Sequence, residues 1–301
     1  MLGLLLANVW AAPNLQPKFT GDESFAESYT AIVDLEDGTY ILAQILFTNA
    51  GFGDQKAGCR ALVVPNGTQG VNGSLQLDSG EWEGKPNRLQ IGDCFLSVEN
   101  QKTHFHVAAQ GVFADLVISQ APKKYNEPDG RIQNDGFYES EVLIAAAQVQ
   151  ATYKTKLGSG AQKGWAYLDH ARSNTLLPQI ASKWYRFRGF YGDEQILIQV
   201  RNPPNGAASQ GWVLRGGAIE SVQSSNVVSG NGELKVTIDG IELWVRGTDL
   251  IYRYEPAKAY GAIGALAQPW IGKPVTLTWR AELSGVEAPV RGILEEASIN
   301  E

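Results

Sequence analysis

Short apolar runs and polar turn residues alternate along nearly the whole chain. Runs rich in Val, Ile, Tyr and Trp are bounded by Gly, Asn, Asp or Pro, as in residues 39–49, 58–66 and 183–190. Such runs, whose side chains point alternately to two sides, are typical of β-strands. Asp239-Gly240, between two further runs, predicts a two-residue hairpin turn. The pattern therefore predicts an all-β protein of many antiparallel strands, folded as barrels or sandwiches.

Helical patterns are weak and occur only at residues 176–184 and 259–270. A faint internal repeat has the same order of strands and turns in both halves of the chain, which suggests two similar domains. The Gly/Ser-rich segment 154–163 predicts the linker between them. We therefore expect one β-barrel at residues 13–153 and a second at residues 164–301, a division that suits a chain of 301 residues.

Composition narrows the class of partner. Hydrophobic residues make up 44% of the chain, enough for a sizeable core, and the net charge is −7. The longest run of basic residues is the pair Lys123-Lys124. A protein that binds nucleic acid needs a basic face, so no nucleic-acid partner is expected.

The N-terminal residues 1–12 resemble the end of a secretory signal peptide. A short apolar run leads to Val9-Trp10-Ala11, which fits cleavage after Ala11. The run is too short to cross a bilayer, so no transmembrane segment is expected. We expect a periplasmic or secreted protein, with a cytoplasmic one as the alternative. The two cysteines, Cys59 and Cys94, leave a disulfide and two buried thiols equally open.

Asp169 and His170 stand side by side in the otherwise apolar run 164–171. Buried carboxylates and imidazoles need partners, because desolvation costs several kcal/mol. Strand alternation places Asp169 on one face with Trp165 and Tyr167, and His170 on the other.

The next run, 183–190, carries Trp184, Arg186 and Arg188 on a single face. If the two runs pair as neighbouring strands, Asp169 lies near Arg186 or Arg188. One interpretation is then a buried ion pair. The other is a catalytic acid, because an apolar cavity keeps a carboxylic acid protonated near neutral pH. Both interpretations remain open at this point.

The remaining polar candidates are the histidines. His104 and His106 share one face of a strand, and His170 is the only other histidine. Three imidazoles could bind zinc, but His170 belongs to the other predicted half and no acidic partner stands out. We therefore expect no metal and no cofactor.

Residues 164–190, "GWAYLDHARSNTLLPQIASKWYRFRGF", and 197–206, "LIQVRNPPNG", resemble the second domain of the two-domain lipocalin-like superfamily. That group includes carotenoid 1,2-hydratase, AttH-like proteins, fungal Diels–Alderases and the survival factor 1 family. Residues 22–51 resemble the first survival-factor domain, and "PVRGILEEAS" (289–298) is similar to the closing strand. Ala171-Arg172-Ser173 departs from the hydratase pattern, in which Asn or Glu and then Trp-Gly follow the Asp-His pair.

The resemblance implies two tandem lipocalin-like (calycin-type) barrels with an apolar ligand in a barrel or at the domain junction. We therefore expect a protein that binds or transports a hydrophobic small molecule, such as a lipid or isoprenoid. The expected ligand-binding residues are Trp165, Tyr167, Trp184, Arg186 and Arg188. The alternative is a lyase or isomerase, a hydratase or cyclase acting on a polyene, with Asp169 as general acid beside His170. A purely structural envelope protein would have no cavity.

Overall fold

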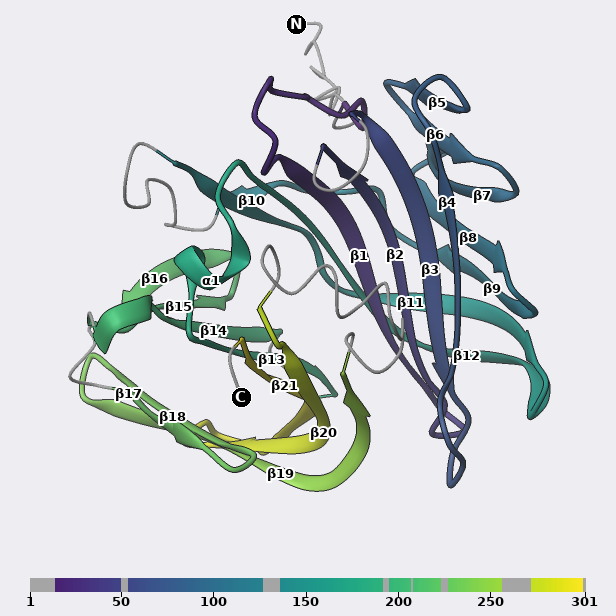
Figure 1. Ribbon diagram of the computed structural model, residues 1–301. Coiled ribbons are helices and arrows are strands. Elements are labelled where there is room, and N and C mark those ends of the chain that lie inside the picture. The colour runs from purple at the N-terminus through teal and green to yellow at the C-terminus, as the bar shows by residue number, and fades with distance from the viewer. Residues whose placement is uncertain are drawn as a thin grey trace, which may run out of the picture.

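Two antiparallel sheets, each curled into a nearly closed barrel, make up the protein (Figure 1). The computed structural model describes residues 14–49, 54–126, 136–191, 195–206, 208–222, 227–255 and 272–299. Nearly all elements in these ranges are strands, which confirms the predicted all-β class and the two tandem lipocalin-like barrels. The expected signal peptide and the weak helical pattern at 259–270 lie outside the described residues.

The first barrel is a 12-stranded sheet in the order β4-β3-β2-β1-β12-β11-β9-β8-β7-β6-β5, with β10 paired to β11. Its strands are β1 (Ala26–Leu35), β2 (Tyr40–Thr48), β3 (Lys56–Val64), β4 (Val71–Leu77), β5 (Trp82–Lys85), β6 (Arg88–Ile91), β7 (Cys94–Glu99), β8 (Lys102–Ala109), β9 (Val112–Ile118), β10 (Tyr125–Asn126), β11 (Tyr138–Thr155) and β12 (Gly158–Ser173).

The second barrel is a 9-stranded sheet in the order β16-β15-β14-β13-β21-β20-β19-β18-β17. Its strands are β13 (Lys183–Tyr191), β14 (Ile196–Asn202), β15 (Gln210–Arg215), β16 (Ala218–Val222), β17 (Val227–Gly230), β18 (Glu233–Ile238), β19 (Ile241–Tyr254), β20 (Val275–Ser284) and β21 (Val290–Ser298). The predicted hairpin turn at Asp239-Gly240 joins β18 to β19, and both of its residues have positive φ.

The two sheets repeat one topology. In each, the first strand pairs with the second and also with the last: β1 with β2 and β12, and β13 with β14 and β21. The two halves expected from the internal repeat are therefore present, and the repeat begins at β1 and β13.

The predicted linker at 154–163 is instead the tip of the β11–β12 hairpin. Thr155 pairs with Gly158, and Gln150 with Lys163. Residues 164–173 then continue along β1, so the first sheet ends at Ser173 and not before residue 164. The sequence misled because a hairpin end uses the same small residues as a linker. Gly164 is required at its position because a Cβ there would lie 2.2 Å from the carbonyl oxygen of Asp34.

The true connection between the barrels runs from Asn174 to Ser182 and holds α1 (Leu177–Ile180), within the predicted helical segment 176–184. A short 3₁₀ turn, η1 (Pro204–Gly206), follows β14. No helix in the described ranges has the length and hydropathy needed to cross a bilayer.

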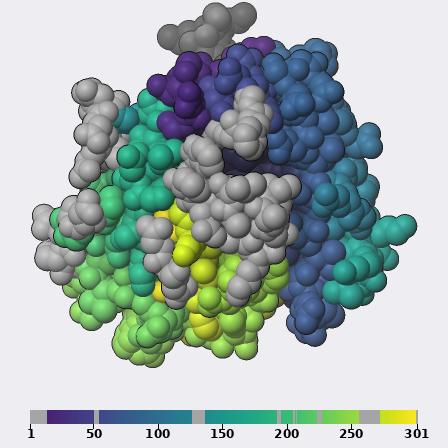
Figure 2. Space-filling view, in the orientation of Figure 1, coloured from purple at the N-terminus to yellow at the C-terminus, as the bar shows by residue number. Residues whose placement is uncertain are grey.

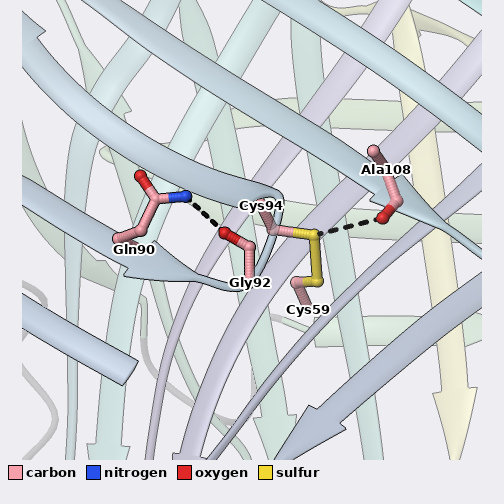
Figure 3. Close-up of a disulfide and its surroundings, with 5 residues drawn as sticks. All are labelled: Cys59, Gln90, Gly92, Cys94 and Ala108. Carbon is pink, nitrogen blue, oxygen red and sulfur yellow. Dashed lines mark hydrogen bonds between the residues drawn. A yellow bond between two sulfur atoms is a disulfide. The ribbon is translucent and has the colours of Figure 1, made fainter. Parts of the chain in front are cut away.

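Buried side chains form a core inside each barrel. Inward-facing apolar residues form one core in the first barrel and a separate core in the second. A disulfide joins Cys59 on β3 to Cys94 at the start of β7, inside the first core (Figure 3). The Cα atoms of the pair lie 6.4 Å apart, and 35 positions separate them in the sequence. The question left open by the sequence is therefore answered by a bond between two buried sulfurs on strands that are not neighbours.

A third apolar cluster packs the outer faces of the barrels against each other. Ile32 and Tyr167 of the first barrel belong to it, together with Phe190, Leu197 and Ile293 of the second. In the space-filling view the blue surface of the first barrel lies directly against the green surface of the second (Figure 2). The outer faces of the two sheets therefore form a packed apolar interface.

Candidate functional site

A cavity of about 270 Å³ lies between the outer faces of the two barrels. The first barrel contributes strands β1 to β4 and the start of β11, and the second contributes β13 and β19 to β21. The polar and aromatic residues that line it are Thr30, Tyr40, Gln44, Arg60, Asn72, Tyr138, Trp184, Arg186, Arg188, Tyr252, Tyr254, Thr276, Thr278 and Glu295, beside the apolar Leu42, Leu62, Leu177 and Ala297.

Strand β13 supplies the centre of this lining. Tyr185 and Phe187 point into the core of the second barrel, so the alternate residues Trp184, Arg186 and Arg188 face the first barrel. The sequence predicted this shared face. Three of its expected site residues therefore lie together in the cavity wall.

Asp169 lies behind that wall, next to Arg186. Its carboxylate Oδ2 is 3.5 Å from Arg186 Nη1, and its side chain is only 2% exposed. Within the described residues this oxygen accepts no hydrogen bond, so the contact is purely ionic. Arg186 also donates a hydrogen bond from Nη2 to the Tyr138 hydroxyl, at 2.9 Å. The residue predicted as an acid in a cavity is thus an ion-pair partner of a residue that lines one.

The route to this pair differs from the sequence prediction. Strands β12 and β13 were expected to be neighbours in one sheet, but β12 pairs with β1 and β11 in the first sheet and β13 with β14 and β21 in the second. Asp169 and Arg186 meet face to face across the boundary. The link that includes α1 carries the chain from one sheet to the other instead of closing a hairpin.

Arg188 forms the second ionic contact of the wall. Its Nη1 lies 2.6 Å from Glu295 Oε2 on β21, and its guanidinium lies 4.5 Å from the ring centre of Tyr167. The Tyr40 hydroxyl donates to Glu295 Oε1 at 3.4 Å. Burial, together with the nearby Glu295 charge, raises the pKa of Tyr40 well above its ordinary value. Tyr40 therefore remains a hydrogen-bond donor throughout the physiological range.

The wall formed by the first barrel carries a third arginine. Arg60 donates from Nε to Gln44 Oε1 at 2.8 Å, and Gln44 donates onward to the Thr30 hydroxyl at 3.0 Å. Its guanidinium also lies 4.9 Å from the ring centre of Tyr254, on the opposite wall. Three arginines and one glutamate thus line a cavity in a chain whose net charge is −7.

His170, predicted beside Asp169 as a catalytic partner, points the other way. Its ring stacks on Tyr29 of the first core at 4.4 Å, and its Nε2 lies 2.8 Å from Glu27 Oε1. Nδ1 lies 3.4 Å from Glu141 Oε2. Burial alone would lower the pKa of His170, but the hydrogen bonds that the ring donates to Glu141 and Glu27, together with the negative charges of these carboxylates, raise it above its ordinary value. The pair that looked like one site is split between a barrel interior and the inter-barrel boundary.

Trp165 and Tyr167 lie on the same face of β12 as Asp169, as predicted, and belong to the apolar cluster between the barrels. Trp165 meets Tyr191 edge to face at 6.4 Å, whereas Tyr167 lies beneath Arg188. Neither residue is part of the cavity lining. Both residues pack in the apolar cluster between the barrels, next to the residues that line the cavity.

Glu295, Tyr40 and Arg60 were not predicted as site residues from the sequence. The signal for Glu295 was available, because "RGILEEAS" places two carboxylates in an otherwise apolar strand, as the Asp169-His170 run does. Glu296 turns inward and accepts a hydrogen bond from the backbone N–H of Gly232, while Glu295 faces the cavity. No local sequence pattern indicated Tyr40 or Arg60, because their contacts in the cavity are with Glu295 and Tyr254 of the second barrel.

Two antiparallel barrels packed around a polar cavity define the two-barrel lipocalin-like fold, and comparison with known proteins agrees. No family model and no curated protein matches the chain by sequence. Solved structures do match, at 11% identity, over almost the whole chain. Identity this low shows a shared fold alone.

One of the neighbours, an AttH-like protein, belongs to a group that the sequence resemblance named. An AttH-like protein from Nitrosomonas europaea has a TM-score of 0.65 and 11% identity, over 91% of this chain and 92% of its own. Kievitone hydratase from Nectria haematococca has a TM-score of 0.60 and 11% identity, over 97% and 93%. CghA solved with Sch210972 has a TM-score of 0.54 and 11% identity, over 96% and 94%. These similarities confirm the predicted two-barrel fold.

Proposed function

We propose that the protein is an enzyme of lyase or isomerase type, a hydratase or cyclase, that holds its substrate between the two barrels. The observation that carries this proposal is the convergence of Arg186, Arg188, Glu295 and Tyr40 on one cavity between the barrels. The similarity to a structure named kievitone hydratase supports it. Each barrel interior, where a lipid carrier would hold its ligand, contains a core of buried apolar side chains.

The cavity groups suit a reaction in which negative charge develops on a substrate oxygen. Guanidinium groups and a protonated phenol, held by the fold before the substrate arrives, stabilise an oxyanion such as an enolate. Glu295 is the carboxylate that lines the same space and can accept a proton from water or from a substrate hydroxyl. Addition of that oxygen to a conjugated double bond, followed by proton return to carbon, is hydration or ring closure.

The substrate class follows from the same lining. Trp184, Tyr252, Tyr254 and Leu62 offer flat apolar surface, and the three arginines offer donors to oxygen. A small conjugated molecule with a carbonyl or acidic hydroxyl can use both kinds of surface, whereas a purely hydrocarbon polyene would use the apolar surface alone. Asp169 then acts as a positioning residue that fixes Arg186.

Binding of a hydrophobic small molecule without chemistry is the second candidate. The aromatic and leucine part of the lining favours it. The two candidates differ in what happens to the ligand, because a binding protein returns it unchanged and an enzyme returns an isomer or a hydrate.

The test is incubation of the protein with a small-molecule extract of the producing organism in ¹⁸O-labelled water, followed by untargeted mass spectrometry. A hydratase yields labelled products and a cyclase yields unlabelled isomers of molecules consumed. We expect Glu295→Gln to slow product formation at least about 100-fold, the usual loss on removal of a general base.

Glu233→Gln is the matched control. Glu233 pairs with Arg246 at 3.8 Å on the exposed surface of the second barrel, away from the cavity, so this variant should keep full activity. Molecules that are retained by the protein and recovered unchanged would favour binding over catalysis. Products formed equally by Glu295→Gln would contradict the assigned role of that residue.

A further inference from the structure

A second polar cluster lies on the outer surface of the first barrel, on strands β8 and β9. These strands are at the edge of the molecule away from the second barrel (Figure 1). Phe105 of β8 and Leu116 of β9 are buried in the barrel core, so His104, His106 and Asp115 beside them point outward. This cluster is separate from the cavity between the barrels.

Strand pairing brings the three side chains together. His106 is directly opposite Asp115 in the β8–β9 pair, and His104 lies two residues along on the same face. Asp115 Oδ1 is 2.7 Å from His104 Nε2 and 2.7 Å from His106 Nδ1. All three ligand-type atoms lie within 4.8 Å of one another.

We propose that His104, His106 and Asp115 form a binding site for a divalent transition metal, zinc above all. Two imidazole nitrogens and one carboxylate oxygen are a donor set that zinc accepts in tetrahedral sites. Bonds of about 2.0–2.1 Å at tetrahedral angles separate ligand atoms by roughly 3.3 Å. The 2.7 Å contacts therefore need to open by only a fraction of an ångström for an ion to replace the protons between the rings and the carboxylate.

Aromatic neighbours hold the two imidazoles in place. Phe95 lies parallel to the His106 ring at 5.0 Å and edge-on to the His104 ring at 4.7 Å. Phe113 meets His106 from the other side at 5.0 Å. Rings fixed by packing lose little freedom when they bind an ion, which favours affinity.

The exposure of the cluster indicates an open site rather than a closed structural one. The side chains of His104, His106 and Asp115 are 37%, 18% and 27% exposed. Three protein ligands on a half-exposed surface leave a fourth position for water or a ligand oxygen, as in zinc sites that bind small molecules.

A zinc site was not expected from the sequence, because His170 was the third ligand considered and no acidic partner stood out. His170 is in the barrel interior with Glu27 and Glu141. The third ligand is instead a single aspartate in the apolar run "VFADLVI". Only the pairing of β8 with β9 reveals it.

Isothermal titration of ZnCl₂ into the chelator-treated full chain tests the site, with Co²⁺ as a spectroscopic probe. We expect one ion per chain and a visible Co²⁺ spectrum typical of tetrahedral coordination. His104→Gln and Asp115→Asn should each weaken binding at least about 10- to 100-fold, the loss that even supporting groups of a metal site produce. Both changes are on the surface, and circular dichroism checks that each variant folds.

His170→Gln is the matched control, since it removes the only other histidine and should leave zinc affinity unchanged. Absence of binding by the wild-type chain would overturn the proposal. So would binding that both surface variants retain, or that His170→Gln abolishes. Turnover in the cavity is measured separately, so failure of this site and failure of the proposed enzyme function are distinguishable.

Discussion

Asp169 of the first barrel and Arg186 of the second form an ion pair across the boundary between two sheets that share no hydrogen-bonded strand. Asp169 is 2% exposed and Arg186 is 23% exposed, so the pair connects the dry packing between the barrels with the cavity wall. The same arginine reaches Tyr138 at the start of β11. One side chain therefore couples barrel packing to the shape of the site.

Asp169→Asn should lower the free energy of unfolding by about 2 to 3 kcal/mol. Loss of one partner of a buried pair costs about 3 to 5 kcal/mol, and the partial exposure of Arg186 reduces this figure. Urea unfolding of wild type and Asp169→Asn measures the difference in the free energy of unfolding. Glu139→Gln, which breaks the exposed Arg172–Glu139 pair, is the control and should cost under about 1 kcal/mol. Unchanged stability together with lost turnover would instead make Asp169 a catalytic residue.

Replacement of both Cys59 and Cys94 by alanine should cost about 4 kcal/mol. In the chain-entropy view, closing a loop of 35 residues stabilises the folded state by roughly this amount. The urea midpoint of the variant should match that of the reduced wild-type protein. Thiol titration of the unreduced, denatured chain should find no free cysteine, and two free thiols would contradict the bond.

The disulfide supports our proposal that the protein works outside a reducing cytoplasm. The expected signal peptide implies the same. Sequencing of the mature N-terminus in the native host should give Ala12 as the first residue. A mature protein that retains Met1 and is found in the cytoplasm would reject both the cleavage and the location.

The His170 network should make stability depend on pH. Glu141 and Glu27 raise the pKa of His170 in the folded state above its ordinary 6.5, despite burial. The stabilisation is then complete below about pH 6.5 and is lost as pH rises through the higher folded-state pKa. Urea unfolding at pH 6 and pH 9 should show a difference between wild type and His170→Gln that shrinks at the higher pH. A difference that grows with pH would contradict this sign.

Gly292→Ala should destabilise the second barrel by about 1 to 3 kcal/mol, the usual cost of inserting a methyl group where there is no room. A Cβ at Gly292 would lie 1.9 Å from the carbonyl oxygen of Arg188, so β21 and β13 would have to separate. Turnover should fall with stability, because Arg188 and Glu295 are on these two strands. Gly21→Ala, which meets no atom within 4 Å, is the control for both measurements.

The fold class could be predicted because strand alternation and turn residues are local signals. The shared outward face of Trp184, Arg186 and Arg188 followed from the same period of two. The predicted contact of Asp169 with Arg186 was right, but the reason given for it was wrong, since alternation shows which way a side chain points and not which sheet it meets. Strand β11 was missed because its Ala-rich middle, "AAAQVQA", has a single β-branched residue, Val149, and no aromatic one.

The candidate site was only partly predictable, for a physical reason. Each barrel buries its own apolar core, so the alternation of apolar and polar residues along a strand shows which side chains point into a barrel. The cavity uses outward-facing residues, which resemble any solvated surface until a second sheet covers them. Arg60 and Tyr40 belong to this class, and their role depends on contacts with residues about 200 or more positions away in the sequence.

Because both barrels line the cavity, its dimensions depend on how one barrel packs against the other and not on the interior of either barrel. Substitutions in the apolar cluster at Ile32, Phe190 or Ile293, none of which lines the cavity, would tilt one body against the other and widen or narrow the gap. If the proposed function holds, proteins of this fold can differ in the size of substrate they accept while keeping the same polar residues in the cavity. The residues of the apolar cluster would then determine the size of the cavity, and the residues of its lining would determine the chemistry.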